Sequence, residues 1–586
     1  MAKMFKYLKP KEWLMAGFSL LFIVVQVWLD LKLPEYMSTI TRLTQTPGSA
    51  MGHIWANGAN MLLCALGSVA AAVIVGYFAA KISASFSQRL RSLLFYKVES
   101  FSMEEISRFS TSSLITRSSN DITQVQMLIV IGLQLIIKAP IMAAWAITKI
   151  AGKGIQWSMA TGAGVLVVLL MVVLLMIFVI PKFKKMQILT DNITRVTREN
   201  LTGLRVVRAY NAEDYQEALF DRANHELTST QMFTSRAMSV MMPVMSAMMS
   251  GLSLAIYWIG AHLIHGAGTA EKLTVFSDMV VFSQYSMQVI MAFMMLVMLF
   301  IMLPRASVSA RRIHEVLDTE PAILDGAETE GKPGMAGEVE FRSVRFQYPG
   351  AGEPVLEDIS FTAKRGETVA FIGSTGSGKS TLINLVPRFY DATGGEVLVD
   401  GVNVRNYKQE SLFNKIGYVP QKAVLFKGTV SSNVAFGDRG ADDFTHDQVH
   451  WAVGVAQGAD FVEKMDGAYE AAIAQGGANV SGGQKQRLAI ARAVCRWPEI
   501  YIFDDSFSAL DYKTDRVLRS ILKKETAGVT SLIVAQRIGT IMDADQIIVL
   551  DEGRIVGKGT HQELLRRCAV YQEIARSQLS EEELVS

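Results

Sequence analysis

Six long apolar stretches before residue 304 constrain the fold of this chain more than any other feature. A helix needs about 20 mainly apolar residues to cross roughly 30 Å of hydrocarbon. The stretches that meet this length run from Trp13 to about Ile40, then over Asn57–Ala80, Gln126–Thr148, Gln156–Ile180, Met238–Ile264 and Leu273–Leu303. We therefore predict an α-helical membrane domain with six spans over residues 1–304. The first stretch is too long for a cleavable signal peptide and lacks a small-residue cleavage site after it.

Basic residues beside the spans are distributed unevenly, which predicts the orientation. The N-terminal residues and the loops after the second and fourth spans carry 19 lysines and arginines, whereas the opposite side carries only Arg42, Lys149, Lys153 and Lys272. Both termini are therefore predicted to lie in the cytoplasm, as in a multi-pass protein of the cell membrane. The two basic loops are long and poor in glycine and proline, so we expect the membrane helices to continue beyond the bilayer, because long structureless loops are uncommon.

Several ionisable residues fall inside the predicted spans, where charge is costly and usually faces protein or water. Asp30, Lys32 and Lys138 lie at intramembrane depth, and Asp278 lies near the outer end of the sixth span. They are compatible with a polar substrate cavity and equally with a structural ion pair or snorkelling lysines. The sequence leaves both interpretations open.

Methionine is concentrated in the fifth and sixth spans, where 13 of the 30 methionines occur. Flexible thioethers suit binding surfaces that accept many ligand shapes, although plain packing is the commoner use. The candidate cavity residues in this stripe are Met287, Met291, Met295 and Met298.

The remaining residues read as a soluble α/β domain. The net charge of +2 gives no indication of a nucleic-acid partner, and three scattered cysteines match neither a disulfide framework nor a metal site. We expect a polar linker over residues 305–337 and a second domain over 338–586. The strand-like run Thr368–Ile372 is followed by a glycine-rich loop that ends in a lysine and two hydroxyl residues. Its members are Gly373, Ser374, Thr375, Gly376, Ser377, Gly378, Lys379, Ser380 and Thr381.

This loop has the GxxxxGK[ST] pattern in its proper setting between a strand and a helix. Its backbone amides can wrap the phosphates of ATP, while Lys379 is predicted to contact the β- and γ-phosphates. Ser380 is predicted to bind Mg²⁺ together with Asp504, which ends the apolar strand Ile500–Phe503. ATP and Mg²⁺ are therefore the expected substrate and cofactor.

A further segment, Val480-Ser481-Gly482-Gly483-Gln484, precedes this second strand by a short helical interval. It resembles the signature of ATP-binding cassette (ABC) transporters, with Val480 where leucine is usual. Other family-like positions are Tyr348 for adenine stacking, Gln421 near Mg²⁺, and Ser508 and Asp511 in the segment that crosses to a second cassette. The inner-loop sequences Phe109–Arg117 and Glu199–Arg205 also resemble those of ABC exporters.

The resemblance implies six transmembrane helices followed by a P-loop α/β nucleotide-binding domain, that is, an exporter half-transporter. It also implies that two cassettes pair head to tail, each ATP being held between one P-loop and the opposite signature. The regions around Ser102–Arg108 and Ala209–Tyr215 are the candidates for coupling the cassettes to the membrane helices.

Two residues depart from the family pattern at the expected hydrolytic site. Asp505 stands where a glutamate normally polarises water, and Gln536 stands where a histidine is usual; Gln475 also replaces a common glutamate before the signature. This combination resembles the degenerate subunit of heterodimeric exporters. It predicts weak hydrolysis here and a different partner chain that has both glutamate and histidine.

The predicted function is ATP-driven export of amphipathic compounds, whether drugs, lipids or peptides. A slow homodimeric exporter and an ATP-gated channel or regulatory subunit remain alternatives. Fusion of the membrane domain before the cassette argues against an importer, and the six spans exclude a soluble motor.

Overall fold

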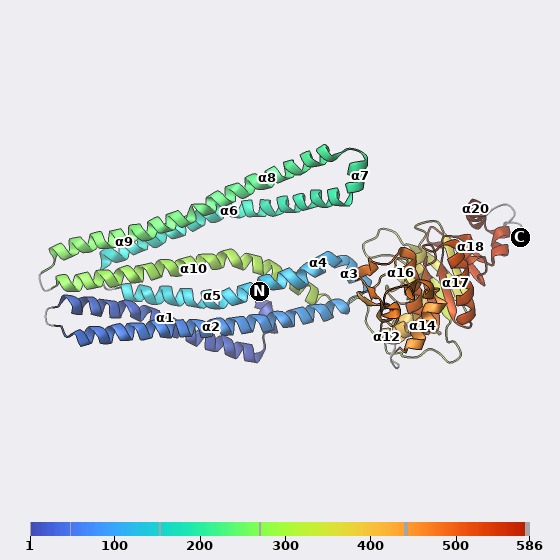
Figure 1. The fold of residues 1–586 in the computed structure, drawn as a ribbon, viewed down its shortest axis with the longest axis horizontal. Coiled ribbons are helices and arrows are strands. Elements are labelled where there is room, and N and C mark those ends of the chain that lie inside the picture. The colour runs from blue at the N-terminus through green and yellow to red at the C-terminus, as the bar shows by residue number, and fades with distance from the viewer. Residues whose placement is uncertain (1, 47–48, 152–153, 269–270, 439–443, 580–586) are drawn as a thin grey trace. The chain divides into compact units, whose positions relative to one another are not determined.

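The computed structural model describes residues 2–46, 49–151, 154–268, 271–438 and 444–579. The chain divides into two compact units. The membrane unit comprises Met1–Glu99 and Ser112–Thr319, and the cassette unit comprises Ser100–Thr111 and Glu320–Ser586 (Figure 1). Lys153, which was counted for the predicted orientation, lies outside the described residues.

The membrane unit is built from long helices, and six candidate spans are found among its described residues, as the sequence predicts. The short elements of this unit are η1 (Ala2–Tyr7), α4 (Thr111–Thr116), the π-helical turn η2 (Arg117–Asp121) and α7 (Leu204–Ala209). The long helices are α1 (Pro10–Gln45), α2 (Met51–Glu99), α5 (Ile122–Ile150), α6 (Ile155–Thr202), α8 (Glu213–Ser239), α9 (Met241–Gly266) and α10 (Lys272–Asp318).

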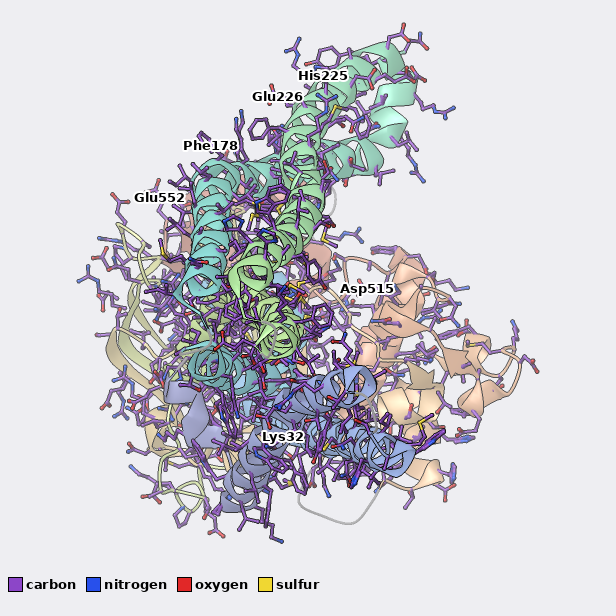
Figure 2. The ribbon with its side chains drawn as sticks, turned by 90° about the vertical axis from the view of Figure 1, so that its left-hand side faces the viewer. Lys32, Phe178, His225, Glu226, Asp515 and Glu552 are labelled. Carbon is purple, nitrogen blue, oxygen red and sulfur yellow. The ribbon has the colours of Figure 1, made fainter. Side chains whose placement is uncertain are left out.

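The expected helical extensions beyond the apolar stretches are confirmed. Helix α2 continues from the apolar run to Glu99, and α6 continues to Thr202. Helices α6 and α8 run side by side to a tip formed by α7 (Figure 1). Phe178 on α6 and the polar His225 and Glu226 on α8 are exposed along this hairpin (Figure 2).

Two boundaries of the predicted domains differ from the structure. Helix α10 runs through the boundary predicted after residue 304 and ends at Asp318, because the end of an apolar run marks where a helix leaves hydrocarbon and not where it stops. The segment Ser100–Thr111, which lies between two membrane helices in the sequence, belongs to the cassette unit and contains α3 (Met103–Phe109).

The cassette unit contains a six-stranded sheet with the order β12-β11-β3-β10-β9-β6 and a four-stranded sheet with the order β2-β1-β4-β5. Strands β6, β9, β10, β3 and β11 pair in parallel, which brings their carboxyl ends to one edge. The six strands are β3 (Thr368–Gly373), β6 (Ile416–Val419), β9 (Ile500–Asp504), β10 (Thr530–Val534), β11 (Gln546–Asp551) and β12 (Arg554–Gly559). The other strands are β1 (Val339–Phe346), β2 (Leu356–Ala363), β4 (Gly394–Val399), β5 (Val402–Asn403), β7 (Gly428–Thr429) and β8 (Ala472–Ile473).

Helices cover the central sheet and complete two apolar cores on its faces. Those that position the site are α11 (Lys379–Asn384), α16 (Gly482–Cys495), α17 (Tyr512–Glu525), α18 (Ile538–Ile541) and α20 (Ala569–Gln578). The remaining helices are α12 (Gln409–Asn414), α13 (Val430–Val434), α14 (His446–Val455), α15 (Ala459–Val462) and α19 (His561–Arg567). Short 3₁₀ turns complete the unit at η3 (Val404–Asn406), η4 (Ala468–Glu470) and η5 (Gln475–Gly477).

The second half of the predicted linker packs against the cassette. The Gly326 amide donates to Tyr407 O at 2.9 Å, and the Arg388 guanidinium donates to Leu324 O at 2.9 Å. The segment that follows α10 is therefore held along the cassette by hydrogen bonds to its own main-chain atoms.

Candidate functional site

The glycine-rich loop joins the end of β3 to the start of α11, as its sequence setting predicts. Gly373 approaches the neighbouring strand so closely that a Cβ there would lie 2.0 Å from Leu550 O. Gly376 has φ of +89° and open space around the position of a Cβ. The loop therefore requires glycine for its shape and leaves an open side lined by backbone, which fits a phosphate group.

Lys379 lies over this loop. Its Nζ donates to Ser374 O at 2.7 Å and to Gly373 O at 2.9 Å. Burial lowers the pKa of Lys379, while the nearby carboxylates Asp504 and Asp505 act to raise it. A cation held inside a loop of backbone amides fits the terminal phosphates of ATP.

The predicted Mg²⁺ residues Ser380 and Asp504 are in direct contact. Ser380 Oγ donates to Asp504 Oδ1 at 2.8 Å, and Asp504 is almost fully buried. Burial raises the pKa of Asp504, and the hydrogen bond from Ser380 opposes this shift. One hydroxyl and one carboxylate that converge beside a phosphate loop fit the oxygen ligands that Mg²⁺ prefers. Gln421, the third predicted Mg²⁺ residue, contacts the neighbouring Asp505.

Asp505 and Gln536, the two residues that depart from the family pattern, are hydrogen-bonded to each other. Gln536 Nε2 donates to Asp505 Oδ2 at 2.8 Å, and Gln421 Nε2 lies 3.4 Å from the same oxygen. Burial raises the pKa of Asp505, against the effect of the hydrogen bonds from Gln421 and Ser508. The parallel pairing of β9 with β10 explains why Asp505 and Gln536 lie together, because Asp504 stands opposite Val534 near the ends of the two strands.

Tyr348, the predicted adenine-stacking residue, lies beside the helix that follows the loop. Its hydroxyl is 3.0 Å from Thr381 Oγ1, and its ring meets Phe346 and Tyr390 edge to face at centroid distances of 4.8 Å and 5.3 Å. The aromatic side chain is thereby fixed next to the phosphate loop.

The signature segment forms the N-terminus of α16. Ser481 caps the helix through a reciprocal pair of hydrogen bonds with Gln484, at 3.3 Å and 2.9 Å. Ser481 and Gly482 are exposed, whereas Val480 packs against the apolar core and Gly483 is half-buried. The hydroxyl, the glycine amides and the helix N-terminus are thus presented on the surface of the cassette.

The two residues predicted to cross toward a second cassette make local hydrogen bonds. Ser508 Oγ donates to the main-chain oxygen of Asp505 at 2.9 Å, and Asp511 caps α17 by accepting from Thr514 N at 3.0 Å. Gln475 is exposed in the turn η5 before the signature.

Gln578 is a contact residue that sequence reasoning missed. From the end of α20, its Nε2 donates to Gln536 O at 2.9 Å and its Oε1 accepts from Ile538 N at 2.8 Å. No motif marks this glutamine, since both contacts are to the main chain. It holds the backbone on either side of Arg537.

The first predicted coupling region contacts the cassette. Ser102 caps α3 together with Glu105, and Glu105 Oε1 accepts from Ala322 N at 3.0 Å. Burial raises the pKa of Tyr390, whereas its hydrogen bond with Ser107 lowers it. Helix α3 is therefore tied to the segment that leads into the cassette.

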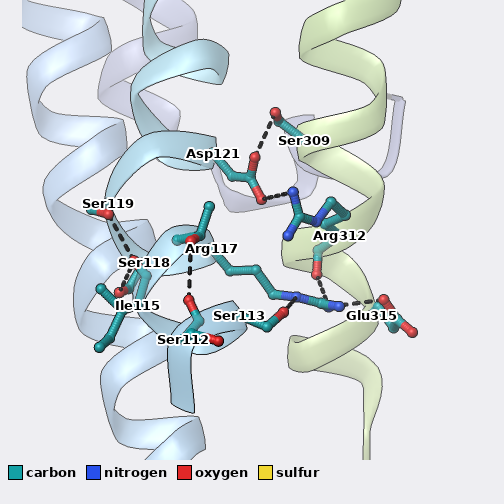
Figure 3. A network of polar contacts seen from close by, with 11 residues as sticks. Ser112, Ser113, Ile115, Arg117, Ser118, Ser119, Asp121, Ser309, Arg312 and Glu315 are labelled. Atoms are coloured by element: carbon teal, nitrogen blue, oxygen red, sulfur yellow. Dashed lines mark hydrogen bonds and ion pairs between the residues drawn. The ribbon is translucent and has the colours of Figure 1, made fainter. Parts of the chain in front are cut away.

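A polar network links η2 to the C-terminal part of α10 in the membrane unit (Figure 3). Arg117 Nη1 donates to Arg312 O at 2.7 Å and to Glu315 Oε2 at 2.8 Å. Asp121 accepts from Ser309 at 2.8 Å, and its second oxygen is 3.4 Å from Arg312 Nη1. The end of the first inner loop and the helix that precedes the cassette thus share charged contacts, in which Arg117 and Asp121 are buried and Arg312 and Glu315 are partly exposed.

Comparison with known proteins agrees with this architecture. The ABC transporter transmembrane region family matches residues 17–303, and the ABC transporter family matches residues 356–508. An uncharacterized ABC transporter ATP-binding protein of Mycobacterium tuberculosis is 40% identical over 557 residues, with 93% of each chain covered. The chain belongs to the ABC transporter family. This ABC transporter has the half-transporter form, with a membrane domain fused to one ATP-binding cassette.

Further relatives of the ABC transporter support the fold. The uncharacterized ABC transporter ATP-binding protein YfiB of Bacillus subtilis is 35% identical over 99% of both chains. An ATP-dependent lipid A-core flippase of Pseudomonas putida is 31% identical, over 83% of this chain and 79% of its own. A solved bacterial Atm1-family ABC exporter with ATP bound has a TM-score of 0.78 at 24% identity, over 97% of this chain and 100% of its own. The likeness to this solved exporter shows that the chain has the ABC exporter fold.

Asp30, Lys32 and Lys138, three of the predicted intramembrane charges of this ABC transporter, occur in ion pairs. Lys138 Nζ lies 3.3 Å from Asp30 Oδ2, and Ser68 donates to the other carboxylate oxygen of Asp30. Glu35 joins Lys32 and Lys149, at 2.5 Å each. These ion pairs favour a structural role for the charges, and their role toward a substrate stays a prediction.

The methionine stripe is divided between packing and exposure. Met291 and Met298 are 45% and 53% exposed, whereas Met287 and Met295 are half-buried. Met295 packs against the apolar core of the membrane unit. Two of the four candidate methionines are thus available to a lipid or a substrate.

Proposed function

We propose that this ABC half-transporter is one subunit of a heterodimeric exporter of amphipathic compounds. Its own phosphate loop retains ATP with slow hydrolysis, while its signature completes the hydrolytic site of a partner subunit. The observation that carries this proposal is the Gln536–Asp505–Gln421 hydrogen-bonded set beside an otherwise complete nucleotide site.

The geometry explains why hydrolysis at this site is expected to be slow. An aspartate is one methylene shorter than glutamate, so its carboxylate is set back by roughly 1.5 Å, and a misplacement of about 1 Å can cost around 10²-fold in rate. The same Asp505 oxygen already receives two side-chain amides, which leaves it less available to orient water. Gln536 also cannot carry the positive charge that a histidine can supply.

ATP binding is supported by the retained part of the site. Lys379, the glycine loop and the Ser380–Asp504 pair have the arrangement that phosphate and Mg²⁺ require. When bound, Mg²⁺ would neutralise charge on the β- and γ-phosphates. Selective loss of the hydrolytic residues, with the binding residues intact, supports a role for ATP as a long-lived link between two cassettes.

A second subunit is supported by two exposed surfaces. The signature serine and its glycine lie at the surface, where they can face the nucleotide of another cassette. The tip around α7 carries exposed apolar side chains at Val206 (60%), Tyr210 (79%) and Tyr215 (68%). Exposed apolar clusters of this kind mark interaction sites. An unlike partner that has both glutamate and histidine would supply the hydrolysis that this subunit lacks.

Export of amphipathic compounds from the cytoplasm or the inner leaflet is supported by the membrane unit. The related flippase of Pseudomonas putida is named for the lipid A core, which is an amphipathic lipid. Exposed methionines and paired charges on the helices offer both apolar and polar contacts. We place the exporter in the cell membrane with both termini in the cytoplasm, on the strength of the basic inner loops.

The test is purification of this subunit from its native membranes, followed by identification of any companion chain. A companion half-transporter with the glutamate and the histidine supports the proposal. Recovery of this chain alone, with brisk ATP turnover that Lys379→Ala abolishes, would show a homodimeric exporter and contradict it.

A further inference from the structure

Tyr390 lies between Tyr348 of the nucleotide site and helix α3 of the first predicted coupling region. Its ring meets the ring of Tyr348 edge to face at a centroid distance of 5.3 Å, and the ring of Phe346 is 5.6 Å away. Its hydroxyl is hydrogen-bonded to Ser107 on α3. All four residues belong to the cassette unit. Tyr390 therefore contacts both the predicted adenine-stacking residue and the coupling region.

These contacts continue to the phosphate loop. The Tyr348 hydroxyl lies 3.0 Å from Thr381 Oγ1, at the start of α11. The main chain beside Tyr390 is held by the buried Arg388, whose guanidinium donates to Asp391 Oδ1 at 2.9 Å. Packed side chains transmit displacements, because protein interiors have low compressibility. A restraint on the Tyr348 ring can therefore reach Tyr390.

Helix α3 depends on contacts with the cassette for its stability. It has only seven residues, and helices shorter than about 12–15 residues are marginal on their own. Its N-terminal end is held by the cap between Ser102 and Glu105 and by the hydrogen bond from Ala322 N to Glu105. Ser107 lies on the last turn, so its hydrogen bond with Tyr390 holds the other end. Loss of one such bond shifts a local opening equilibrium severalfold.

We propose that Tyr390 is a positioning residue that transmits occupancy of the adenine site to α3. A base stacked on Tyr348 would hold that ring against Tyr390, which reduces the motion of Tyr390 and keeps its hydroxyl on Ser107. Without a base, the Tyr348 ring is held on fewer sides and the bond to Ser107 opens more often. The inference rests on the ATP binding of the proposed function and on the predicted adenine contact, and it holds for a like or an unlike partner.

Hydrogen exchange in the complete exporter, reconstituted in nanodiscs with and without saturating ATP and Mg²⁺, tests the link. In the unmodified chain, ATP should slow exchange over residues 103–109 severalfold. Tyr390→Phe, which keeps the ring, and Ser107→Ala should each remove most of this slowing. The double variant should show no further loss, because both changes break the same bond. Tyr348→Leu, which removes the predicted base contact, should lose the slowing to the same extent.

Two controls separate the link from damage to the nucleotide site or to the fold. Exchange over residues 373–381 reports ATP on the phosphate loop and should slow in every variant. Tyr418→Phe is the matched control, since the Tyr418 hydroxyl donates to Asn384 Oδ1 at 3.0 Å and its ring packs on Phe389. This variant also loses a hydrogen-bonded hydroxyl in the cassette unit, and it should keep the full slowing over α3.

Equal slowing over α3 in the unmodified chain and in Tyr390→Phe would overturn the proposal, even if α3 exchanges faster in the variant with and without ATP. That result would show that Tyr390 supports α3 without transmitting the state of the nucleotide site. Loss of the slowing over residues 373–381, additive losses in the double variant, or no slowing over α3 in the unmodified chain would also overturn it. Brisk hydrolysis at Lys379 or a like partner contradicts only the proposed function.

Discussion

This cassette carries two halves of nucleotide sites, and they differ in how far they keep the family pattern. The signature half, at the start of α16, has its serine, both glycines and a complete cap. The phosphate-loop half has its lysine and its Ser380–Asp504 pair, but its two hydrolytic positions hold Asp505 and Gln536.

The difference supports the proposed division of chemistry between the two halves. Binding residues are kept in both halves, which fits the proposal that ATP is held between two cassettes in either orientation. Hydrolytic residues matter only where water is activated, and here they are replaced by a hydrogen-bonded carboxylate and amide. A subunit with this pattern can serve a partner's hydrolysis while its own ATP stays bound.

The largest effect is expected from disrupting the signature half. Ser481→Arg should lower ATP turnover of the heterodimer by about 10²–10³, because it removes a donor and blocks the surface that faces the partner's ATP. Phosphate release by the purified complex measures this. Thr445→Arg is the matched control, since Thr445 caps α14 through the same reciprocal bonds with Gln448 but lies outside the signature. Equal losses in both variants would attribute the effect to helix capping alone.

Restoring the phosphate-loop half should give the next largest change. With the partner's water-polarising glutamate replaced by glutamine, Asp505→Glu together with Gln536→His should raise the residual turnover by up to about 10²-fold. Single-turnover phosphate release is the measurement. Asp505→Asn with Gln536→His serves as the control and should give no gain. Unchanged turnover in the restored variant would show that these two residues do not limit the rate.

Removing ATP from the phosphate-loop half should have a smaller effect on turnover. Lys379→Ala should abolish photolabelling of this subunit by azido-ATP, because the lysine lies against the phosphate loop. Turnover of the complex should fall by less than about tenfold, equivalent to about 1.4 kcal/mol. Lys364→Ala, on the same cassette, should leave both readouts unchanged. A complete loss of turnover would mean that the two halves contribute equally.

The smallest effect concerns the coupling helix. Glu105→Ala should destabilise α3 by about 1 kcal/mol, because it removes half of the cap and the contact with Ala322. Hydrogen exchange over residues 100–111 should increase while exchange at the signature stays the same. Glu104→Ala, on the same turn, should change exchange little. Similar increases in both variants would show that the cap does not hold this helix.

The sequence was sufficient for the spans and for the nucleotide motifs, because hydrophobic length and glycine-lysine spacing are local signals. It also predicted that Asp505 and Gln536 belong to one site. Their direct hydrogen bond follows from the parallel register of β9 and β10, which is a long-range feature. The end of α10 at Asp318 was not predicted, since hydropathy falls where a helix leaves the bilayer. Gln578 could not be found, because its contacts are to main-chain atoms.

The most direct test of the asymmetry is the fate of the terminal phosphate on each subunit. The heterodimer is mixed with azido-ATP that carries a radiolabel at its α- or its γ-phosphate, cross-linked by light after several turnovers, and separated into its chains. We predict that this subunit keeps the γ-label in nearly the same amount as the α-label, while the partner keeps only the α-label. Rapid loss of the γ-label from this subunit, above all without a second chain present, would contradict the account.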